Sequence, residues 1–446
     1  MGFGARLMLQ WSAESRITSE SQPMEWREPS RAVAPPNAGE MAVAWMAAAP
    51  LLLPMGYWLA PVAVLLAAGL AWRDRPSRLA WAGPPAVTMA VLLAFAGAEM
   101  AAGLWHHSAW QDGVTAAMPL VLAAGLAATL GPAVRHLRPR LSWWWSGLAL
   151  GGIGNGLWAL WQAVIDGTSR ANGYHEVNAI LFGNLALLTG LFCLAGLGWA
   201  WQQANRRQWL LVMLLGAAGG LLASALSGTR GGWLALPLAT LVFYRAYLRR
   251  WPRRRRWLVV GGVALLLAGF YLTPQSGVQY RIGVAMDEAV NYLAGEPHGS
   301  VGARLEMYRG ALVLIADRPW MGHGHDGYAS AMSELVAQGR VASGMDRYWH
   351  AHNDLLDAWV RRGLPAMLSL LALYLLPIWY FAPRLVSRDP AMRSLAVAGL
   401  LLPVTFIDFG LSYAFLAYQI GIVVYGGWLG VLVGLWDGQD RVTTAP

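Results

Sequence analysis

Two histidines, an amide and two carboxylates lie within one short polar stretch near the end of the longest polar interval of the sequence. The stretch runs through His350, His352, Asn353, Asp354 and Asp357. Histidine titrates near neutral pH, so it can take a proton from a hydroxyl group or return one. The stretch therefore indicates acid–base chemistry just before the chain becomes apolar again.

Two arginines lie in polar turns between apolar segments. Arg230 belongs to the glycine-rich turn 227–233, and Arg170 lies close to Asn172. Glycines expose backbone N–H groups, and one arginine can bind two phosphate oxygens at once. One interpretation is therefore an anion-binding site at each turn. The other is that each arginine reaches the membrane surface or caps a helix.

Two further combinations contain residue types that bind metals. His323 and His325 precede Asp326, and His350 and His352 precede Asp354. Imidazole and carboxylate groups suit zinc, but this spacing matches no specific metal motif. The sequence also has no P-loop, dinucleotide fingerprint or nucleophile elbow. Arginines facing a histidine favour transfer from an anionic lipid carrier, with the leaving diphosphate stabilised by guanidinium groups instead of a metal.

The elements that position these residues are membrane segments. The 446 residues are 57% hydrophobic and 13% charged, about half of the roughly 25% charge of a soluble protein. Repeated apolar runs of near-spanning length predict an all-α polytopic membrane protein with about twelve transmembrane helices. The first apolar run, 41–72, is broken by prolines and is expected to form two spans. The others are predicted at 79–97, 114–134, 141–163, 177–200, 208–226, 232–248, 257–273, 364–382, 394–410 and 416–436.

The loop arginines set the orientation. Seventeen arginines lie in the short loops of one side and only Arg170 and Arg230 in the alternate ones. Because positive loops stay in the cytoplasm, both termini are predicted there, and the interval 274–363 faces the periplasm of a bacterium. The net charge of +9 thus reflects topology, which excludes nucleic-acid binding. The predicted order is a tail (1–40), nine spans (41–273), a periplasmic loop (274–363), three spans (364–436) and a tail (437–446).

The predicted periplasmic loop has its own helical pattern. A short helix is expected over 287–294, and an amphipathic helix over 304–316, with Arg304 and Tyr308 one turn apart on one face. A polar span with a mobile-looking sequence follows. Asn353 or Asp354 is expected to cap a helix that ends near Arg361.

Three motifs together resemble a known family, the bacterial O-antigen ligases and related O-antigen polymerases. The turn at 227–236, the arginine helix with its Pro-Trp-Met-Gly-His-Gly turn at 304–324 and the histidine motif at 350–356 are similar to the family's motifs. In the ligases, a His-Asn pair is also followed by nine residues and then by the pattern Gly-x-x-(Gly/Thr/Tyr). Here the pair is His352-Asn353, and Gly363 fits the pattern. Ala366 stands where the family has Gly, Thr or Tyr.

The resemblance implies a membrane glycosyltransferase of the GT-C class, working without a metal or other cofactor. It would transfer O-antigen from undecaprenyl diphosphate to the lipid A core oligosaccharide at the periplasmic face of the inner membrane. His352 would be the base, and Arg230 and Arg304 would hold the diphosphate. His350, Asn353 and Tyr308 would be supporting residues that bind substrate. Three further substrate-binding candidates are chosen for their position in the predicted outer loops and not for a motif match: Arg281, Arg170 and Asn172.

Other functions stay open at this stage. An O-antigen polymerase or a protein O-oligosaccharyltransferase would use similar residues on another acceptor. A polyprenyl-diphosphate carrier or flippase would bind the same anion without chemistry. A transporter places its charged groups near mid-membrane, often within repeated halves. Here the polar groups gather on one face, which favours an enzyme.

Overall fold

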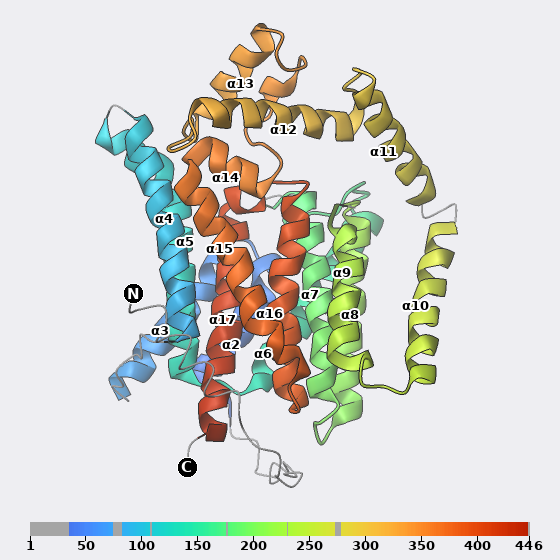
Figure 1. The fold of residues 1–446 in the computed structure, drawn as a ribbon. Helices are drawn as coiled ribbons and strands as arrows, with labels where there is room; N and C mark the ends of the chain where they lie inside the picture. Colours follow the sequence, from blue (N-terminus) through green and yellow to red (C-terminus); the bar gives the residue numbers. More distant parts are fainter. Residues whose placement is uncertain are drawn as a thin grey trace, which may run out of the picture. The chain divides into compact units, whose positions relative to one another are not determined.

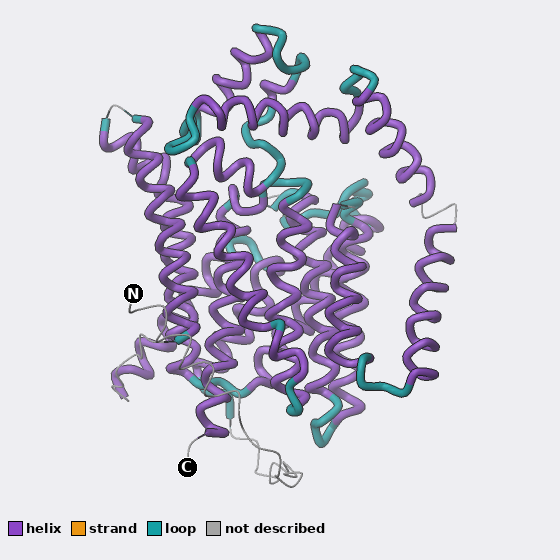
Figure 2. Tube along the Cα trace, in the orientation of Figure 1, coloured by secondary structure: helices purple, strands orange, loops and turns teal. Residues whose placement is uncertain are grey.

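The computed structural model describes residues 35–74, 83–107, 109–174, 177–229, 231–272 and 278–444. The residues from Ala38 onward form one compact unit. The described residues form sixteen α-helices with short 3₁₀ and π turns, and their one β-bridge pairs Gly173 with Val177. The predicted all-helical class is confirmed (Figures 1 and 2).

Twelve of the α-helices correspond to the predicted spans. They are α2 (Ala38–Leu52), α3 (Gly56–Asp74), α4 (Pro84–His106), α5 (Trp110–Leu137), α6 (Leu141–Val164), α7 (Ala179–Ala200), α8 (Arg206–Leu226), α9 (Ala235–Phe243, continued by η2, Tyr244–Leu248), α10 (Arg253–Leu272), α15 (Leu364–Phe381, followed by η5, Pro383–Val386), α16 (Pro390–Gly410) and α17 (Gln419–Thr444). As predicted, the first apolar run forms two helices.

Within the described residues, eight of these helices are long and apolar enough to cross a membrane, namely α3, α4, α5, α7, α8, α15, α16 and α17. The chain is therefore a multi-pass helical membrane protein. The other four fall short for identifiable reasons. Helices α2 and α9 are short, α6 is rich in Trp and Gly, and α10 opens with four arginines.

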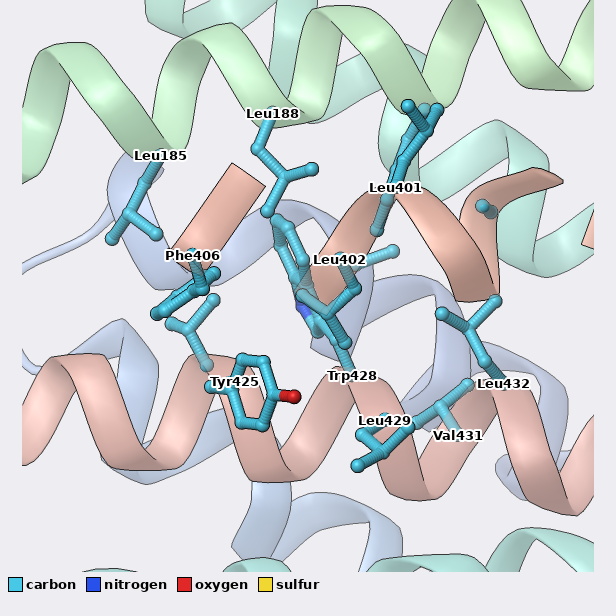
Figure 3. Close-up of a cluster of buried hydrophobic side chains, with 14 of the residues drawn as sticks. Leu185, Leu188, Leu401, Leu402, Phe406, Tyr425, Trp428, Leu429, Val431 and Leu432 are labelled. Carbon is cyan, nitrogen blue, oxygen red and sulfur yellow. The ribbon is translucent and has the colours of Figure 1, made fainter. Parts of the chain in front are cut away.

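The centre of the bundle is α17, which is buried on nearly every side and packs against α5 and α16. Figure 3 shows Trp428 and Tyr425 of α17 beside leucines of α7 and α16. The indole N–H of Trp428 donates to the carbonyl of Met46 on α2 (3.0 Å). A helix that is apolar all round belongs inside a bundle, so α17 fixes the outer helices around it.

Four further helices lie together at one end of the bundle, which we call the site end (Figure 1). They are α11 (Val278–Leu293), α12 (Gly299–Asp317), α13 (Gly327–Ala337) and α14 (Asp354–Arg362). Helices α12, α13 and α14 share a small hydrophobic core of their own that includes Met307, Tyr328, Met332 and Val360. This core seats α12 and α14 against each other, which brings the arginine helix next to the histidine motif.

Close packing of α6 against α8 depends on facing glycines. A Cβ atom on Gly152 would lie 2.2 Å from the carbonyl oxygen of Gly216, and one on Gly156 would lie 2.6 Å from Cα of Gly219. Small residues allow membrane helices to approach this closely, where dispersion forces and not water exclusion hold them. The short distance between the helices is thus encoded by residue size.

We predict that Gly152→Val lowers stability by about 1–3 kcal/mol, because overpacking would force α6 and α8 apart. Thermal unfolding of the purified protein in detergent measures the effect. Gly125→Val is the control, since nothing lies within 4 Å of a Cβ atom at Gly125. Equal unfolding temperatures for the two variants would contradict this account of the packing.

Candidate active site

His350 and His352 lie in the loop before α14, and local contacts orient both rings. The N–H of His352 donates to Nδ1 of His350 (3.1 Å), and Nδ1 of His352 lies 3.2 Å from the carbonyl oxygen of His350. A carbonyl oxygen only accepts, so Nδ1 of His352 carries the ring proton when the ring is neutral. The lone pair is then on Nε2, the nitrogen that can accept a proton from a substrate.

Helix α14 begins directly after the histidines because Asn353 caps it. The side-chain oxygen of Asn353 accepts hydrogen bonds from the N–H groups of Leu355 and Leu356, both 3.1 Å. These bonds pair donors that the start of a helix leaves free. His352, just before the cap, has a φ of 52°, a left-handed conformation that is uncommon outside glycine. The predicted cap is confirmed, with Asn353 as the capping residue.

Asp357 ties the histidine loop to α14. Its Oδ1 accepts a hydrogen bond from the N–H of Ala351 (3.1 Å), the residue between the two histidines. Its Oδ2 lies 3.3 Å from Nη1 of Arg361 and 3.6 Å from Nη2 of Arg362. Burial alone would raise the pKa of this carboxyl, but the two guanidinium groups hold the pKa below its usual value. Asp357 is therefore a charged anchor for the loop.

Two tyrosines between α16 and α17 form a wall beside the histidine rings. The ring of Tyr413 meets His350 and His352 edge-on at centroid distances of 4.9 and 5.3 Å. The hydroxyl of Tyr418 lies 2.5 Å from that of Tyr413 and 3.4 Å from Nε2 of His350. Since Nδ1 of His350 accepts the His352 N–H, its Nε2 carries the proton and donates to Tyr418.

Burial keeps both histidines neutral at ordinary pH. It lowers the pKa of His350 to about 3, against the opposing charge of Asp357. It also lowers the pKa of His352 from 6.5, and the charge of Arg304 adds to this shift. A charged ring loses hydration when buried, and a nearby cation repels it further. His352 is thus available as a base near neutral pH.

Arg304 and Tyr308 reach the histidine loop from α12, as the helical spacing predicted. The hydroxyl of Tyr308 donates to the carbonyl oxygens of His352 (3.2 Å) and Leu411. Among the described residues, no acceptor forms a hydrogen bond or ion pair with the guanidinium of Arg304. Its charge acts on His352 and Tyr308, so an unneutralised cation lies close to the His352 ring.

Arg170 and Asn172 are held mainly by their own surroundings. Nε of Arg170 donates to the carbonyl of Ser227 (3.0 Å) at the end of α8, which agrees with the helix-capping interpretation. The N–H of Asn172 donates to the side chain of Gln162 (2.8 Å), and its carbonyl accepts from Trp158 (2.8 Å). Arg170 therefore braces the turn that leads to Arg230.

Among the contacts that the structure describes, none joins the histidine loop to two of the predicted site residues, Arg230 and Arg281. Arg230 lies outside the described residues. A Cβ atom on its neighbour Gly231 would lie 2.6 Å from the hydroxyl oxygen of Ser412, so Gly231 packs closely against that serine. Arg281 lies in α11, which begins earlier than the predicted helix at 287. Site roles for Arg230 and Arg281 stay predictions.

The second pair of histidines is separated by its contacts. Nε2 of His323 lies 2.8 Å from the carbonyl of Leu314, so it ties the turn after α12 to that helix. Nδ1 of His325 contacts the guanidinium of Arg361, and burial lowers the pKa of His325 to about 4. Among the described residues, no three His, Cys, Asp or Glu side chains are grouped to hold a metal ion.

A cavity of about 390 Å³ opens beside the aromatic wall. It is lined by aromatic and polar groups that include Trp349, Tyr418, Asn178 and Gln419. The ring of Trp349 meets the ring of His350 edge-on, with a centroid distance of 4.6 Å. The cavity therefore adjoins the histidine loop, on the side formed by the ends of α3, α5, α7 and α17.

Several site residues had no signal in the local sequence. Tyr413 lies between the predicted spans 394–410 and 416–436, Tyr418 lies at the start of the second, and Arg362 looks like an ordinary helix-terminal cation. Helix α13 lies in the polar span with a mobile-looking sequence, where no helix was predicted. A buried face of Tyr328 and Met332, four residues apart, was the available indication.

The fold and this site define a multi-pass helical membrane protein that holds a neutral histidine and a free cation at one end of its bundle. Residues 215–371 match the family model described as O-antigen ligase. The chain thus carries an O-antigen ligase family domain, and all three motifs of the histidine and arginine site lie within it.

The chain is also similar to two curated proteins. A protein of Haemophilus influenzae described as uncharacterized is 30% identical over 206 residues, 46% of this chain and 52% of the relative. The O-antigen ligase of Escherichia coli K12 is 25% identical over 238 residues, 51% of this chain and 55% of the relative. The matched regions thus span about half the length of each relative.

The other carboxylate of α14, Asp354, makes the stability of the protein depend on pH. Its oxygens accept hydrogen bonds from the N–H of Leu416 and the hydroxyl of Tyr374, both 2.8 Å. Burial raises its pKa from 3.8 to about 7. Between these values the folded state binds more protons than the unfolded state, so the wild type loses stability as the pH rises.

We predict that Asp354→Asn gains stability relative to the wild type as the pH rises from about 4 to about 7. The gain should approach the order of 4 kcal/mol, the equivalent of a shift of about three pKa units. Thermal unfolding of both proteins across this window measures the difference. A constant difference at every pH would show that the carboxyl of Asp354 ionises in the folded protein as it does in the unfolded chain.

Proposed function

We propose that this protein is an O-antigen ligase of the bacterial inner membrane. It transfers O-antigen from undecaprenyl diphosphate to the lipid A core oligosaccharide at the periplasmic face. The observation that carries the proposal is the pairing of His352, with its lone pair on Nε2, and the free cation Arg304. The family match and the ligase relative in Escherichia coli support the same conclusion.

The proposed orientation places the site end in the periplasm. All twelve helices that correspond to predicted spans cross the membrane in this proposal, including α2, α6, α9 and α10. The seventeen arginines of the opposite loops favour the cytoplasm for that side. Donor and acceptor are both lipid-linked, so a site at the membrane surface can receive their polar groups while their lipid parts stay in the bilayer.

In the proposed reaction, Nε2 of His352 takes the proton from an acceptor hydroxyl on the core sugar. The hydroxyl oxygen forms a bond to the anomeric carbon of the donor sugar. The bond from that carbon to the diphosphate breaks, and undecaprenyl diphosphate leaves with the electron pair. Arg304 and Arg230 stabilise the negative charge that grows on the diphosphate. No metal or other cofactor enters the proposal.

The remaining predicted residues take supporting roles. His350, through its carbonyl oxygen, orients the ring of His352, Tyr308 holds the His352 carbonyl, and Asn353 starts α14. Arg170 and Asn172 shape the turn next to Arg230, and Arg281 stays a candidate for substrate contact. Each of these roles is part of the proposal.

The first test is genetic. His352→Ala should abolish ligation in a strain that lacks its own ligase but assembles O-antigen on the lipid carrier. Wild type and variant are compared at equal membrane levels, with extracted lipopolysaccharide separated on a gel. We expect a ladder from the wild type alone, because the variant has no base for the acceptor hydroxyl.

Other results would change the conclusion in defined ways. A ladder from both proteins would remove His352 as the essential base. No ladder from well-expressed wild type would contradict the ligase assignment in that host. A strain lacking its polymerase and an assay of protein glycosylation would then test the two related activities.

The second test concerns the coupling between Arg304 and His352. Because burial and Arg304 lower the pKa of His352, we predict that the activity of the wild type is lost on acidification only below pH 6.5. In Arg304→Gln this acid limb should move to higher pH, since a repelling cation is gone. Turnover by the purified enzyme as a function of pH measures both. An unchanged acid limb would mean that the essential base is not near Arg304.

A further inference from the structure

Glu99 carries a carboxylate within the membrane span α4. It lies seven residues before His106, the last residue of the helix, which places it about 10 Å below the site end of α4. Its side chain is only 3% exposed. Ionisable groups inside a membrane are costly and are usually retained for a function, with a specific partner.

The partner of Glu99 is Arg362 of α14. Nε of Arg362 forms an ion pair with Oε2 of Glu99, and both side chains are 3% exposed. Nη2 of Arg362 lies 3.6 Å from Oδ2 of Asp357. Oδ1 of Asp357 accepts the N–H of Ala351, the residue between the two histidines. A chain of three contacts therefore leads from the membrane span to the histidine loop.

The charges of this chain balance only when Glu99 is included. Glu99 and Asp357 supply two negative charges, and Arg361 and Arg362 supply two positive ones. All four side chains are buried. Breaking a buried pair by removing one partner leaves an uncompensated charge, which costs far more than replacing the whole pair by apolar groups. Without Glu99, Arg362 would have Asp357 as its remaining anion and would pull on the carboxylate that holds Ala351.

Helix α4 touches the site at a second point. Nε2 of His106 lies 2.9 Å from the carbonyl oxygen of Met321, and Gly324 packs against the ring of His106. Both contacts fall on the turn after α12. Helix α4 thus meets both α14 and the end of the arginine helix, although it lies outside the matched residues 215–371.

We propose that Glu99 is a positioning residue for the His352 base, acting through Arg362 and Asp357. This proposal rests on the proposed function for its kinetic readout. Glu99 keeps Arg362 neutralised, so that Asp357 remains free to fix the Ala351 N–H and the rings on either side. Glu99 does not contact substrate, so Glu99 affects turnover and not donor binding.

The test uses the full-length enzyme in nanodiscs with lipid-linked O-antigen and O-antigen-free lipopolysaccharide. We expect Glu99→Gln to lower kcat by about tenfold or more, as expected for a displaced catalytic group, with KM for the donor changed by less than about twofold. Hydrogen exchange at the peptide containing Ala351 should become faster. In Glu99→Gln/Arg362→Met, which removes the charge imbalance, kcat and exchange should both return towards the wild type.

Glu40→Gln is the matched control. Glu40 is also 3% exposed and pairs with Arg140 (2.5 Å), but at the opposite end of the bundle. It should lower the unfolding temperature while leaving kcat and the exchange of the Ala351 peptide unchanged. If Glu99→Gln yields no folded protein, Glu99→Asp replaces it, and an intermediate loss of kcat is expected because the contact with Arg362 lengthens.

Two results would overturn the proposal. One is wild-type kcat and exchange in Glu99→Gln. The other is a double variant no better than the single one, because charge balance would then not be the cause. Absence of turnover by the wild type would reject the proposed function alone, since the exchange comparison still decides whether Glu99 orders the histidine loop.

Discussion

The carboxylate of Asp357 holds the candidate site together, because it joins a loop to a helix at a position that water does not reach. Helix α14 has only nine residues, too few to be stable by itself. It is fixed by the Asn353 cap at its start and by charge pairs along its buried face. Asp357 takes part in those pairs and also accepts the N–H of Ala351. An unpaired charge in such a place would be expensive, so the order of the loop and the pairing of the charges depend on each other.

The same burial sets the chemistry of the histidines. An exposed imidazole near neutral pH is a mixture of protonated and neutral rings. Here burial lowers the pKa of both rings, and the carbonyl of His350 selects which nitrogen of His352 carries the proton. A nearby cation weakens a base, but in the proposed glycosyl transfer the same cation would favour the leaving anion. Arg304 thus lowers the basicity of His352, and in the proposed reaction it would stabilise the negative charge that develops on the diphosphate.

The sequence predicted those features that depend on local pattern. Apolar runs of spanning length, the helical spacing of Arg304 and Tyr308 and the cap at Asn353 are properties of neighbouring residues. The prediction failed or was silent where contacts join distant segments. Asp354 accepts a bond from Leu416, Tyr413 flanks the histidine rings, and Glu99 pairs with Arg362. Nothing in the order of the residues specifies which helix ends meet, because that follows from packing around α17.

These long-range contacts show which parts of the chain the proposed activity would need. The matched domain, 215–371, contains Arg304, Tyr308 and His352. The groups that hold them come from both sides of it: Glu99 and His106 from α4, and Tyr413 and Tyr418 from the loop before α17. A membrane helix cannot be removed from a bundle without exposing its polar partners to lipid. The domain that carries the motifs therefore depends on the flanking spans for its geometry, and changes in α4 or in the 411–418 loop should alter turnover without altering any motif residue.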